Sequence, residues 1–457
     1  MSAAFPPDRT SVPYRSGRSG RGSSVNVVEL RAVRAWHPNP SKADANELVC
    51  PVYDTLSENE LERFSHRSFN AAGFVPRPKS LPLDRFVRNA VGHLGAALRA
   101  GAYIADERPG LYVYGIRYVP PPDILETIEP AERRAEYLLL GLVGCLDFGR
   151  IAHGEVALHE RVFDDRVDER VALTDATGMS FAPILAGYHL PDHHLNERLE
   201  ALLGLDRRGL SFEGSVPPLI EATLDGTTHR LWRIDSPRDV EELQGIARAL
   251  RLLILDGHHR FTAAARRFHA GRASFPLTML VDGTDRALRV LPWHRVVPAS
   301  VAAPSELQAG ARREFSDVVD LDAAPTPEAA LGRLRAMHRA GHRGFLLSDG
   351  QTWSEVRGPA SDDVGADFDL LHEFLEGRQG IDPHEMVFVR SPRLALESVR
   401  SEGGKAPAGT ALLLPPLTEK GIEERAFGRG TVMAHKSTMF LPKVAEGMIF
   451  APADGRG

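Results

Sequence analysis

The segment LDGHHRFTAAARRF, Leu255 to Phe268, combines residue types that bind phosphate. An apolar run, a turn at Asp256-Gly257 and an amphipathic continuation predict a strand that passes directly into a helix. The free N–H groups and positive dipole end of such a helix attract anions, and Gly257 lets the backbone approach a ligand closely. Arg260 would add a bidentate phosphate contact. We therefore expect a phosphate-binding strand-to-helix junction at the functional centre.

Three further side chains of this segment have chemical uses. Asp256, at the end of the expected strand, can hold a magnesium ion or a substrate amine, and His258 and His259 can donate to phosphate oxygens. Adjacent histidines point apart on a helix, which argues against a paired metal site. The alternative is that Asp256 only caps the helix and that both histidines lie on the surface.

A second candidate segment is GEVALHERVFDDR, Gly154 to Arg166. Glu160 stands next to His159, and a carboxylate beside a histidine can act as a general base. Spacing alone favours the other interpretation, a solvated start of a helix. The segment contains no HExxH, so a zinc protease is not indicated.

Two more segments bring basic side chains. In LRVLPWHRVV, His294-Arg295 interrupts a β-rich run, as residues that line a cleft do, although a purely structural role fits equally well. Near the C-terminus a basic, hydroxyl-rich segment can reach phosphate or form a surface loop. Its residues are His435, Lys436, Ser437, Thr438 and Lys443.

Composition excludes several classes of protein. The chain has two cysteines, too few for a disulfide framework or a four-thiolate zinc site, which fits a cytoplasmic protein. The net charge of −6 argues against a nucleic-acid partner. Apolar stretches are too short for a membrane span. No Walker loop, GxGxxG or GxSxG occurs in a supporting context. The oligomeric state leaves no trace in the sequence.

The elements around these residues predict a mixed α+β fold. Residues 1–24 read as a basic, disordered tail, 25–300 as an α+β core, and 301–457 as a C-terminal α/β region whose segment 431–450 folds back to the site. In the core we expect strands at 25–36, 110–119, 137–148, 181–188, 252–255, 276–281 and 288–297, and helices at 83–99 and 258–270. Beyond 301 we expect helices at 305–315, 327–340, 368–375, 392–402 and 418–427, and strands at 345–347, 386–389 and 411–414.

Assembled in this order, the chain resembles the bacterial and archaeal family catalogued as domain of unknown function 1015. The most specific motifs are DGHHR, starting at Asp256, and a C-terminal KST-F-PK pattern, Lys436 to Lys443. The other motifs are CPVYD (50–54), LYVYGIRY (111–118), GEVALHE (154–160), FAPILAGY (181–188) and LPWHRVV (291–297). The chain departs from the family's usual pattern in reading CPVYDT for APPYDV and LPWHR for LPTHR.

The family's DGHHR helix is similar to the nucleotide-binding box of the ParB and sulfiredoxin superfamily. That superfamily includes free serine kinases and CTP-binding partition proteins. The resemblance implies a ParB/sulfiredoxin-like core. It also implies that Asp256, His258, His259 and Arg260 contact phosphates and metal, with Asp256 on the metal. Glu160, in the family's HE motif, is implied as the base that deprotonates a serine hydroxyl.

The leading hypothesis is a kinase that uses ATP or ADP, or else CTP, with Mg²⁺ to phosphorylate a serine-like hydroxyl. Glu160 would act as the base, and Lys436 and Arg295 would close over the phosphates. One alternative is a nucleotide-gated regulatory protein without transfer chemistry. A third is a hydrolase that uses the same phosphate site.

Overall fold

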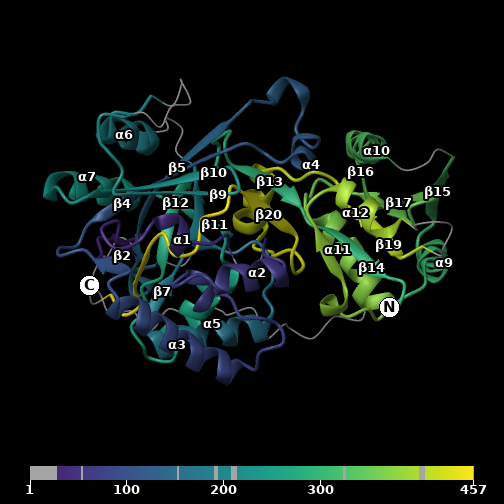
Figure 1. Ribbon diagram of the computed structural model, residues 1–457. Helices are drawn as coiled ribbons and strands as arrows, with labels where there is room; N and C mark the ends of the chain where they lie inside the picture. The colour runs from purple at the N-terminus through teal and green to yellow at the C-terminus, as the bar shows by residue number, and fades with distance from the viewer. Residues whose placement is uncertain are drawn as a thin grey trace.

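The protein is described by a computed structural model that covers residues 28–52, 55–151, 154–189, 194–206, 214–322, 326–400 and 407–455. The expected tail, 1–24, lies outside the described residues, as do Tyr53 and Asp54 of the CPVYD motif. Two α/β parts lie side by side (Figure 1). Helices and strands mix along both, in agreement with the expected α+β class.

The central sheet mixes parallel and antiparallel pairs and has nine strands in the described parts of the chain. Its order is β6 (Val156–Ala157), β11 (Leu252–Asp256), β8 (Ile184–Tyr188), β12 (Leu277–Asp282), β5 (Tyr137–Leu146), β4 (Leu111–Tyr118), β10 (Thr227–Ile234) and β9 (Ile220–Leu224). β1 (Leu30–Arg31) pairs with β5 beside this path. Asp225-Gly226, a dipeptide that favours tight hairpin turns, joins β9 and β10.

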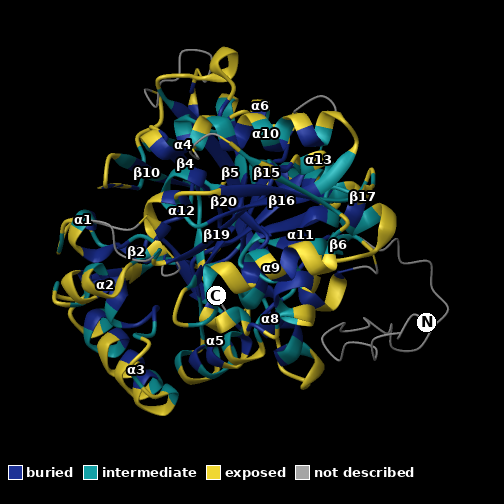
Figure 2. Cartoon of the chain, turned by 90° about the vertical axis from the view of Figure 1, so that its right-hand side faces the viewer, coloured by how far each residue is buried: buried dark blue, intermediate teal, exposed yellow. Residues whose placement is uncertain are grey.

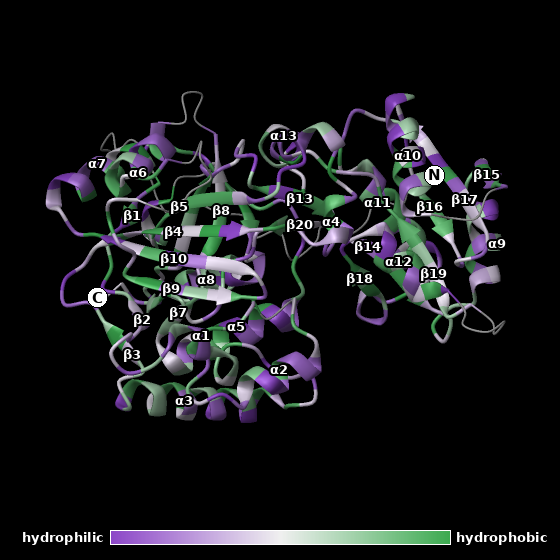
Figure 3. Cartoon of the chain, turned by 45° about the horizontal axis from the view of Figure 1, so that its top comes forward, coloured by the Kyte–Doolittle hydropathy of each residue, from purple (hydrophilic) through white to green (hydrophobic). Residues whose placement is uncertain are grey.

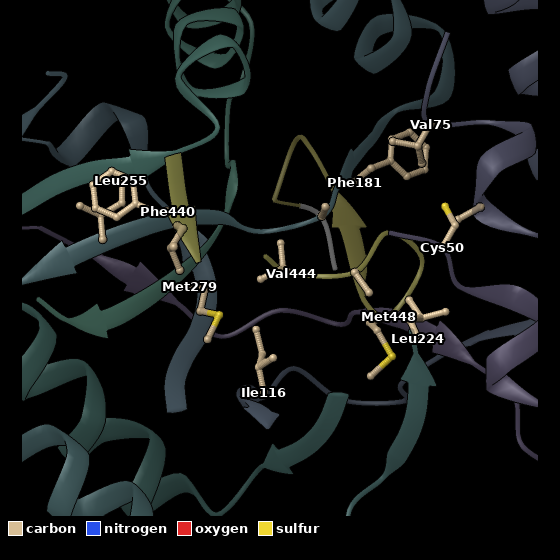
Figure 4. Packing of buried hydrophobic residues seen from close by; sticks show 14 of the residues in the cluster. Cys50, Val75, Ile116, Phe181, Leu224, Leu255, Met279, Phe440, Val444 and Met448 are labelled. Carbon is tan, nitrogen blue, oxygen red and sulfur yellow. The ribbon is translucent and has the colours of Figure 1, made fainter. Parts of the chain in front are cut away.

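β5 is buried along its whole length, which explains its almost purely apolar sequence. Leu138, Leu140 and Leu142 belong to one hydrophobic cluster, while Leu139 and Val143 belong to another on the opposite face. Figure 4 shows part of the second cluster, where side chains from the central sheet meet those of the C-terminal segment.

Helices cover both faces of the central sheet. α3 (Leu83–Arg99) packs into the cluster that contains Leu139, whereas α6 (His194–Leu203) and α7 (Pro237–Ala247) pack into the cluster that contains Leu138. α5 (Asp164–Thr177) packs against α8 (His258–His269). Figure 2 shows exposed outer helix faces around buried strands. Three short helices complete this part: α1 (Ala45–Leu48), α2 (Glu58–Ser65) and α4 (Pro122–Leu125).

Two small sheets attach the C-terminal segment to earlier parts of the chain. One has the order β3 (Tyr103–Ala105), β2 (Trp36–Pro38), β21 (Phe450–Pro452) and β7 (Met179–Phe181). The other pairs β13 (Arg289–Pro292) with β20 (Thr438–Leu441). Segments far apart in sequence are therefore hydrogen-bonded next to the central sheet.

The second part is built on a separate sheet (Figure 3). Its order is β15 (Asp317–Leu321), β17 (Trp353–Ala360), β16 (His342–Ser348), β19 (Gly409–Leu413), β14 (His294–Pro298) and β18 (Val387–Val389). Its helices are α9 (Pro304–Glu314), α10 (Pro327–Arg339), α11 (Ala366–His372), α12 (Pro392–Val399) and α13 (Glu419–Glu423). α11 and α13 continue as π-helical turns at Glu373–Arg378 and Glu424–Arg429.

Three expected strands are broken, and those predictions were wrong in detail. The run 288–297 divides at Trp293 into β13 and β14, which lie in different sheets. The run 181–188 divides at Ala182, which has a positive φ and precedes a proline. In 25–36, the described residues pair with β5 only at Leu30–Arg31, and Val33 then bridges to Gly110. The alternation of apolar residues predicts that these segments are buried strands. It does not show where the chain leaves one neighbouring strand and pairs with another.

Of the described helices, none combines the length and the apolar character that crossing a bilayer requires.

Candidate functional site

The predicted strand-to-helix junction is confirmed. β11 ends at Asp256, and α8 begins immediately after Gly257, which has φ of 88°. The positive φ favours glycine here, and a Cβ at Gly257 would lie 2.9 Å from Nε of Arg260 and would displace that side chain. No side chain caps the first turn of α8, so Asp256 is not a helix cap.

Asp256 lies between two cations instead. Its Oδ1 forms an ion pair with Nζ of Lys443, and its Oδ2 lies 3.0 Å from Nη2 of Arg260. Burial opposes ionisation of the carboxyl, but Lys443 and Arg260 outweigh burial and hold its pKa well below the usual range. Arg260 also donates to the carbonyl oxygens of Ala182 and Pro183, at 2.8 and 3.0 Å. Much of the Arg260 guanidinium is therefore bound within the protein.

Glu160 is held by the C-terminal segment. Residues 433–443, called the strap below, begin where Met433 bridges to Glu160. Oε2 of Glu160 accepts hydrogen bonds from the backbone N–H groups of Ser437 and Thr438, at 3.1 and 3.2 Å. Glu160 is only 8% exposed, and α5 begins four residues later, so Glu160 is not a solvated helix start.

His258 lies between Glu160 and His159. Its Nδ1 is 3.6 Å from Oε1 of Glu160, and its Nε2 is 3.2 Å from Nδ1 of His159. The two imidazole rings pack edge to face, with their centres 4.4 Å apart. Burial lowers the pKa of His258 to about 3 and that of His159 to about 3, so both rings are neutral at pH 7. The surface alternative for His258 is wrong, because it is 4% exposed.

His159 connects β11 to the strap. Its Nδ1 lies 2.7 Å from the carbonyl oxygen of Ile254, and its Nε2 lies 2.7 Å from Oγ1 of Thr438. A carbonyl only accepts, so Nδ1 carries the proton and Nε2 accepts from the Thr438 hydroxyl. A neutral His159 therefore satisfies both contacts.

His259 points toward the start of α5. Its Nε2 accepts a hydrogen bond from the backbone N–H of Phe163 at 3.1 Å. Burial lowers the pKa of His259 well below the ordinary value, so the ring is neutral and its proton lies on Nδ1. The residue that precedes α5 is thus hydrogen-bonded to the first turn of α8.

A cleft of about 410 Å³ opens at this junction. Most of the side chains expected at a site line it, together with two strap residues that the sequence had marked only as members of a basic segment. These are Glu160, Asp256, Gly257, His258, His259, Arg260 and Lys436, with Thr438 and Lys443. The second part of the molecule contributes Trp293, Met386 and Phe388, and the N-terminal part contributes Glu58, Arg77 and Lys79.

Lys436 faces the cleft from a strained backbone. Its φ is 52°, in the left-handed region that residues other than glycine seldom adopt, and its Nζ lies 5.7 Å from the centre of the Trp293 ring. Arg295 does not line the cleft. It is 5% exposed and donates to the carbonyl oxygens of Trp293 and His435, so it connects the backbone at Trp293 to the residue before Lys436.

Sequence reasoning gave no role to Arg77 and Lys79, which also line the cleft. Their signal is two basic residues that alternate with prolines in VPRPKS, between α2 and α3. That pattern alone is typical of an ordinary surface loop. Only the fold brings it next to DGHHR.

The donor set limits how the expected Mg²⁺ can bind. Within the described residues, no group of three or more histidine, cysteine, aspartate or glutamate side chains is placed to hold a metal ion. Asp256 is ionised, as a magnesium ligand must be, but both of its oxygens already face cations. One such carboxylate suits a Mg²⁺ carried on nucleotide phosphates, not a metal held by protein alone.

Comparison with known proteins assigns the chain to a family. Residues 30–371 match the family described as "Protein of unknown function (DUF1015)". The chain belongs to this family. No curated protein matches this DUF1015 chain.

Solved structures similar to the chain include a free serine kinase in complex with AMP, at 14% identity and a TM-score of 0.36 over 63% of this chain and 84% of that one. A conserved hypothetical protein from Pyrococcus furiosus has 15% identity and a TM-score of 0.32 over 63% and 87%. SbnI from Staphylococcus aureus, truncated at its C-terminus, has 13% identity and a TM-score of 0.34 over 66% and 84%. At these TM-scores the likeness carries no weight for function, which is inferred below from the site's side chains.

Proposed function

We propose that this DUF1015 protein is a cytoplasmic, nucleotide-dependent phosphotransferase that phosphorylates the hydroxyl of a small molecule, with serine or a serine-like amino acid as the first acceptor to test. The observation that carries the proposal is the joint placement of Glu160, the β11–α8 junction and the strap lysines around one cleft. Phosphoryl transfer needs phosphate-binding charge and a base in the same site. ATP and ADP are the first donors to test, with CTP as the third.

The phosphate-binding charge comes from α8 and the strap. α8 begins at the cleft with uncapped N–H groups, which attract phosphate oxygens. Lys436 and Lys443 line the same cleft and bind phosphate as point charges. Asp256 positions Lys443 through their ion pair. His258 and His259 are neutral, so they contribute hydrogen bonds rather than charge.

Glu160 is the proposed base. Two strap amides fix Oε2, which leaves Oε1, on the side of His258, to accept the proton of the acceptor hydroxyl. The acceptor oxygen then forms a bond to the terminal phosphorus, the bond from that phosphorus to the bridging oxygen breaks, and the shortened nucleotide leaves. Mg²⁺ on the phosphates, with Asp256 as its protein ligand, would supply further neutralisation.

Phosphorus NMR tests this function directly. Protein incubated with ATP, ADP or CTP and a panel of hydroxy amino acids should give the signal of a new phosphomonoester. Glu160→Gln should abolish transfer and spare nucleotide binding, measured by calorimetry. Glu155→Gln is the matched control, because Glu155 precedes Glu160 by five residues and lies outside the cleft lining. Equal transfer by wild type and Glu160→Gln would contradict the assignment.

A second candidate is a nucleotide-gated regulatory protein without transfer chemistry. It is favoured by the bonds from Glu160 to Ser437 and Thr438, because a carboxylate that fastens the strap also suits a conformational switch. The same NMR assay separates these functions. Nucleotide binding with unchanged phosphorus signals supports the switch, and inorganic phosphate alone supports a hydrolase.

A further inference from the structure

Three arginines surround one buried carboxylate at the edge of the cleft. Glu169, on α5, is 2% exposed. It accepts a hydrogen bond from Nε of Arg77 at 2.5 Å and forms an ion pair with Arg170. Nη1 of Arg166 lies 3.6 Å from the same carboxylate. A single buried anion thus fixes guanidinium groups from two separate parts of the chain.

The charges of this group do not balance. Arg77 and Arg166, the two guanidinium groups that line the cleft, share the single negative charge of Glu169 with Arg170, so this carboxylate cannot neutralise both of them. Arg166 also lies 3.9 Å from Asp165, but that aspartate is more than half exposed and water screens the pair. Lys79, two residues after Arg77, is exposed to solvent and also lines the cleft, so water screens its charge more than that of Arg77. Arg77, Lys79 and Arg166 line the cleft, so their excess charge acts on whatever binds there.

The other carboxylates of the cleft do not cancel this charge. Asp256 is paired with Lys443 and Arg260, and Glu160 accepts from the strap amides. Glu58 remains, but it is exposed to solvent and accepts from the backbone N–H of Lys79 at 3.4 Å. The cleft therefore favours an anion over a cation next to Arg77 and Arg166.

This anion-binding group is adjacent to the phosphate-binding junction. Arg166 is in the first turn of α5, and Phe163, just before that turn, donates its N–H to His259 in the first turn of α8. The two groups therefore line the same cleft of about 410 Å³.

We infer that Arg77, Lys79 and Arg166 form a second anion subsite, which binds a carboxylate or phosphate group of the acceptor. The acceptor is then an acidic hydroxy compound, and the subsite holds its acid while its hydroxyl faces Glu160. This inference rests on the proposed function for the identity of the ligand as an acceptor. Arg77, Lys79 and Arg166 are specificity-determining residues in this scheme.

Kinetics with a matched acceptor panel test the subsite. The panel is glycerate, with a carboxylate; glycerol 3-phosphate, with a phosphate; and glycerol, with no acid. In Arg77→Gln and Arg166→Gln we expect the KM of the preferred acidic acceptor to rise about 10- to 100-fold, the effect of losing one charge-assisted contact. The KM of glycerol and the Kd of ADP should stay within about twofold. The ratio between glycerate and glycerol 3-phosphate identifies the acidic group.

Two controls separate binding from folding. Arg77→Lys and Arg166→Lys keep the charge and should recover part of the lost affinity, whereas Arg99→Gln, an exposed change on α3 outside the cleft, should change nothing. Equal melting temperatures of Arg166→Gln and wild type show that the fold is intact. A variant that weakens acidic and acid-free acceptors equally overturns the inference.

Failure of the proposed function is distinguishable from failure of the subsite. If no acceptor is phosphorylated, calorimetry on the ADP-saturated protein still measures binding of glycerate and inorganic phosphate. The wild type should bind one of them, and the double variant Arg77→Gln/Arg166→Gln should bind it at least tenfold more weakly. No binding to the wild type, or equal binding to both proteins, overturns the inference.

Discussion

Lys443 of the strap forms an ion pair with Asp256, a residue 187 positions earlier in the chain. Both side chains are largely buried, at 12% and 15% exposed. The C-terminal segment and the β11–α8 junction therefore line the same side of the cleft, held together by this ion pair. The sequence had marked Lys443 only as one member of a basic segment.

Replacing Lys443 with methionine should destabilise the protein. Asp256 would keep only Arg260 as a cationic partner, and breaking a buried ion pair costs about 3 kcal/mol. Urea unfolding measures the loss. Lys420→Met is the control, because Lys420 is exposed on α13. In a double-mutant cycle, Asp256→Asn and Lys443→Met together should cost less than the sum of the single changes. Strict additivity would contradict the pairing.

The Thr438 hydroxyl should stabilise the strap. It lies 2.7 Å from Nε2 of His159 and 3.2 Å from Oε2 of Glu160, and Thr438→Val removes it at nearly constant volume. We expect the free energy of unfolding to fall by about 1–3 kcal/mol, because a buried acceptor loses its donor. Thr431→Val, at an exposed hydroxyl, should have no effect in the same urea titration. Equal stability of both variants would argue against the hydrogen bond.

Stability should fall on mild acidification. Burial lowers the pKa of His159, His258 and His294 to about 3, whereas an unfolded chain titrates near 6.5. Between these values the unfolded state binds more protons, so the free energy of unfolding falls as pH falls below about 6.5. Each histidine contributes a slope of up to about 1.4 kcal/mol per pH unit. His294→Gln should reduce the measured slope and leave nucleotide binding unchanged; a slope that stays the same would refute the assignment for His294.

Gly257→Ala should weaken nucleotide binding. The substitution places a Cβ at a residue with φ of 88°, which strains the backbone, and 2.9 Å from Nε of Arg260, whose side chain must move. We expect a loss of about 1–3 kcal/mol in stability together with weaker ADP binding by calorimetry. Gly245→Ala is the matched control in α7, where nothing lies near the new Cβ, and it should stabilise slightly. A Gly257→Ala protein that binds ADP normally would exclude close approach of ligand to this turn.

Mg²⁺ alone should not bind measurably. Asp256 is the only carboxylate we expect to meet the metal, and Lys443 and Arg260 already oppose its charge. Melting temperatures should therefore be the same with and without millimolar MgCl₂, and should rise only when nucleotide is added. A shift with Mg²⁺ alone would reveal a metal site built by protein side chains.

The local part of the site could be predicted from sequence. A helix was expected at 258–270 and is found at His258–His269, and the helix at Leu83–Arg99 has the expected bounds. Apolar periodicity, a glycine turn and DGHHR all act over a few residues, so they are visible in one segment. Ser57 and Glu60, which form a capping box at the start of α2, are another pattern that spans only a few residues.

The non-local part could not be predicted in the same way. The run 288–297 has the alternation of a single strand, yet its two halves belong to different sheets. Between them, the backbone N–H of Trp293 donates to the carbonyl oxygen of Ser437. β15 and β17 were not expected at all. Arginine is a residue type that binds phosphate, but the guanidinium group of Arg260 donates hydrogen bonds to the carbonyl oxygens of Ala182 and Pro183. These partners come from segments far away in the sequence, and neither segment contains a local pattern that indicates the contact.

The strap also has a consequence for synthesis of the protein on the ribosome. When residue 430 is added, β11, α8 and Glu160 have long been made, but the lysine that pairs with Asp256 and the amides that hold Glu160 do not yet exist. In the nascent chain, the carboxylates of Asp256 and Glu160 therefore lack these partners until the strap has been synthesised. A chain that ends before the strap therefore leaves Asp256 with Arg260 as its cationic partner and leaves Glu160 without its two amide donors.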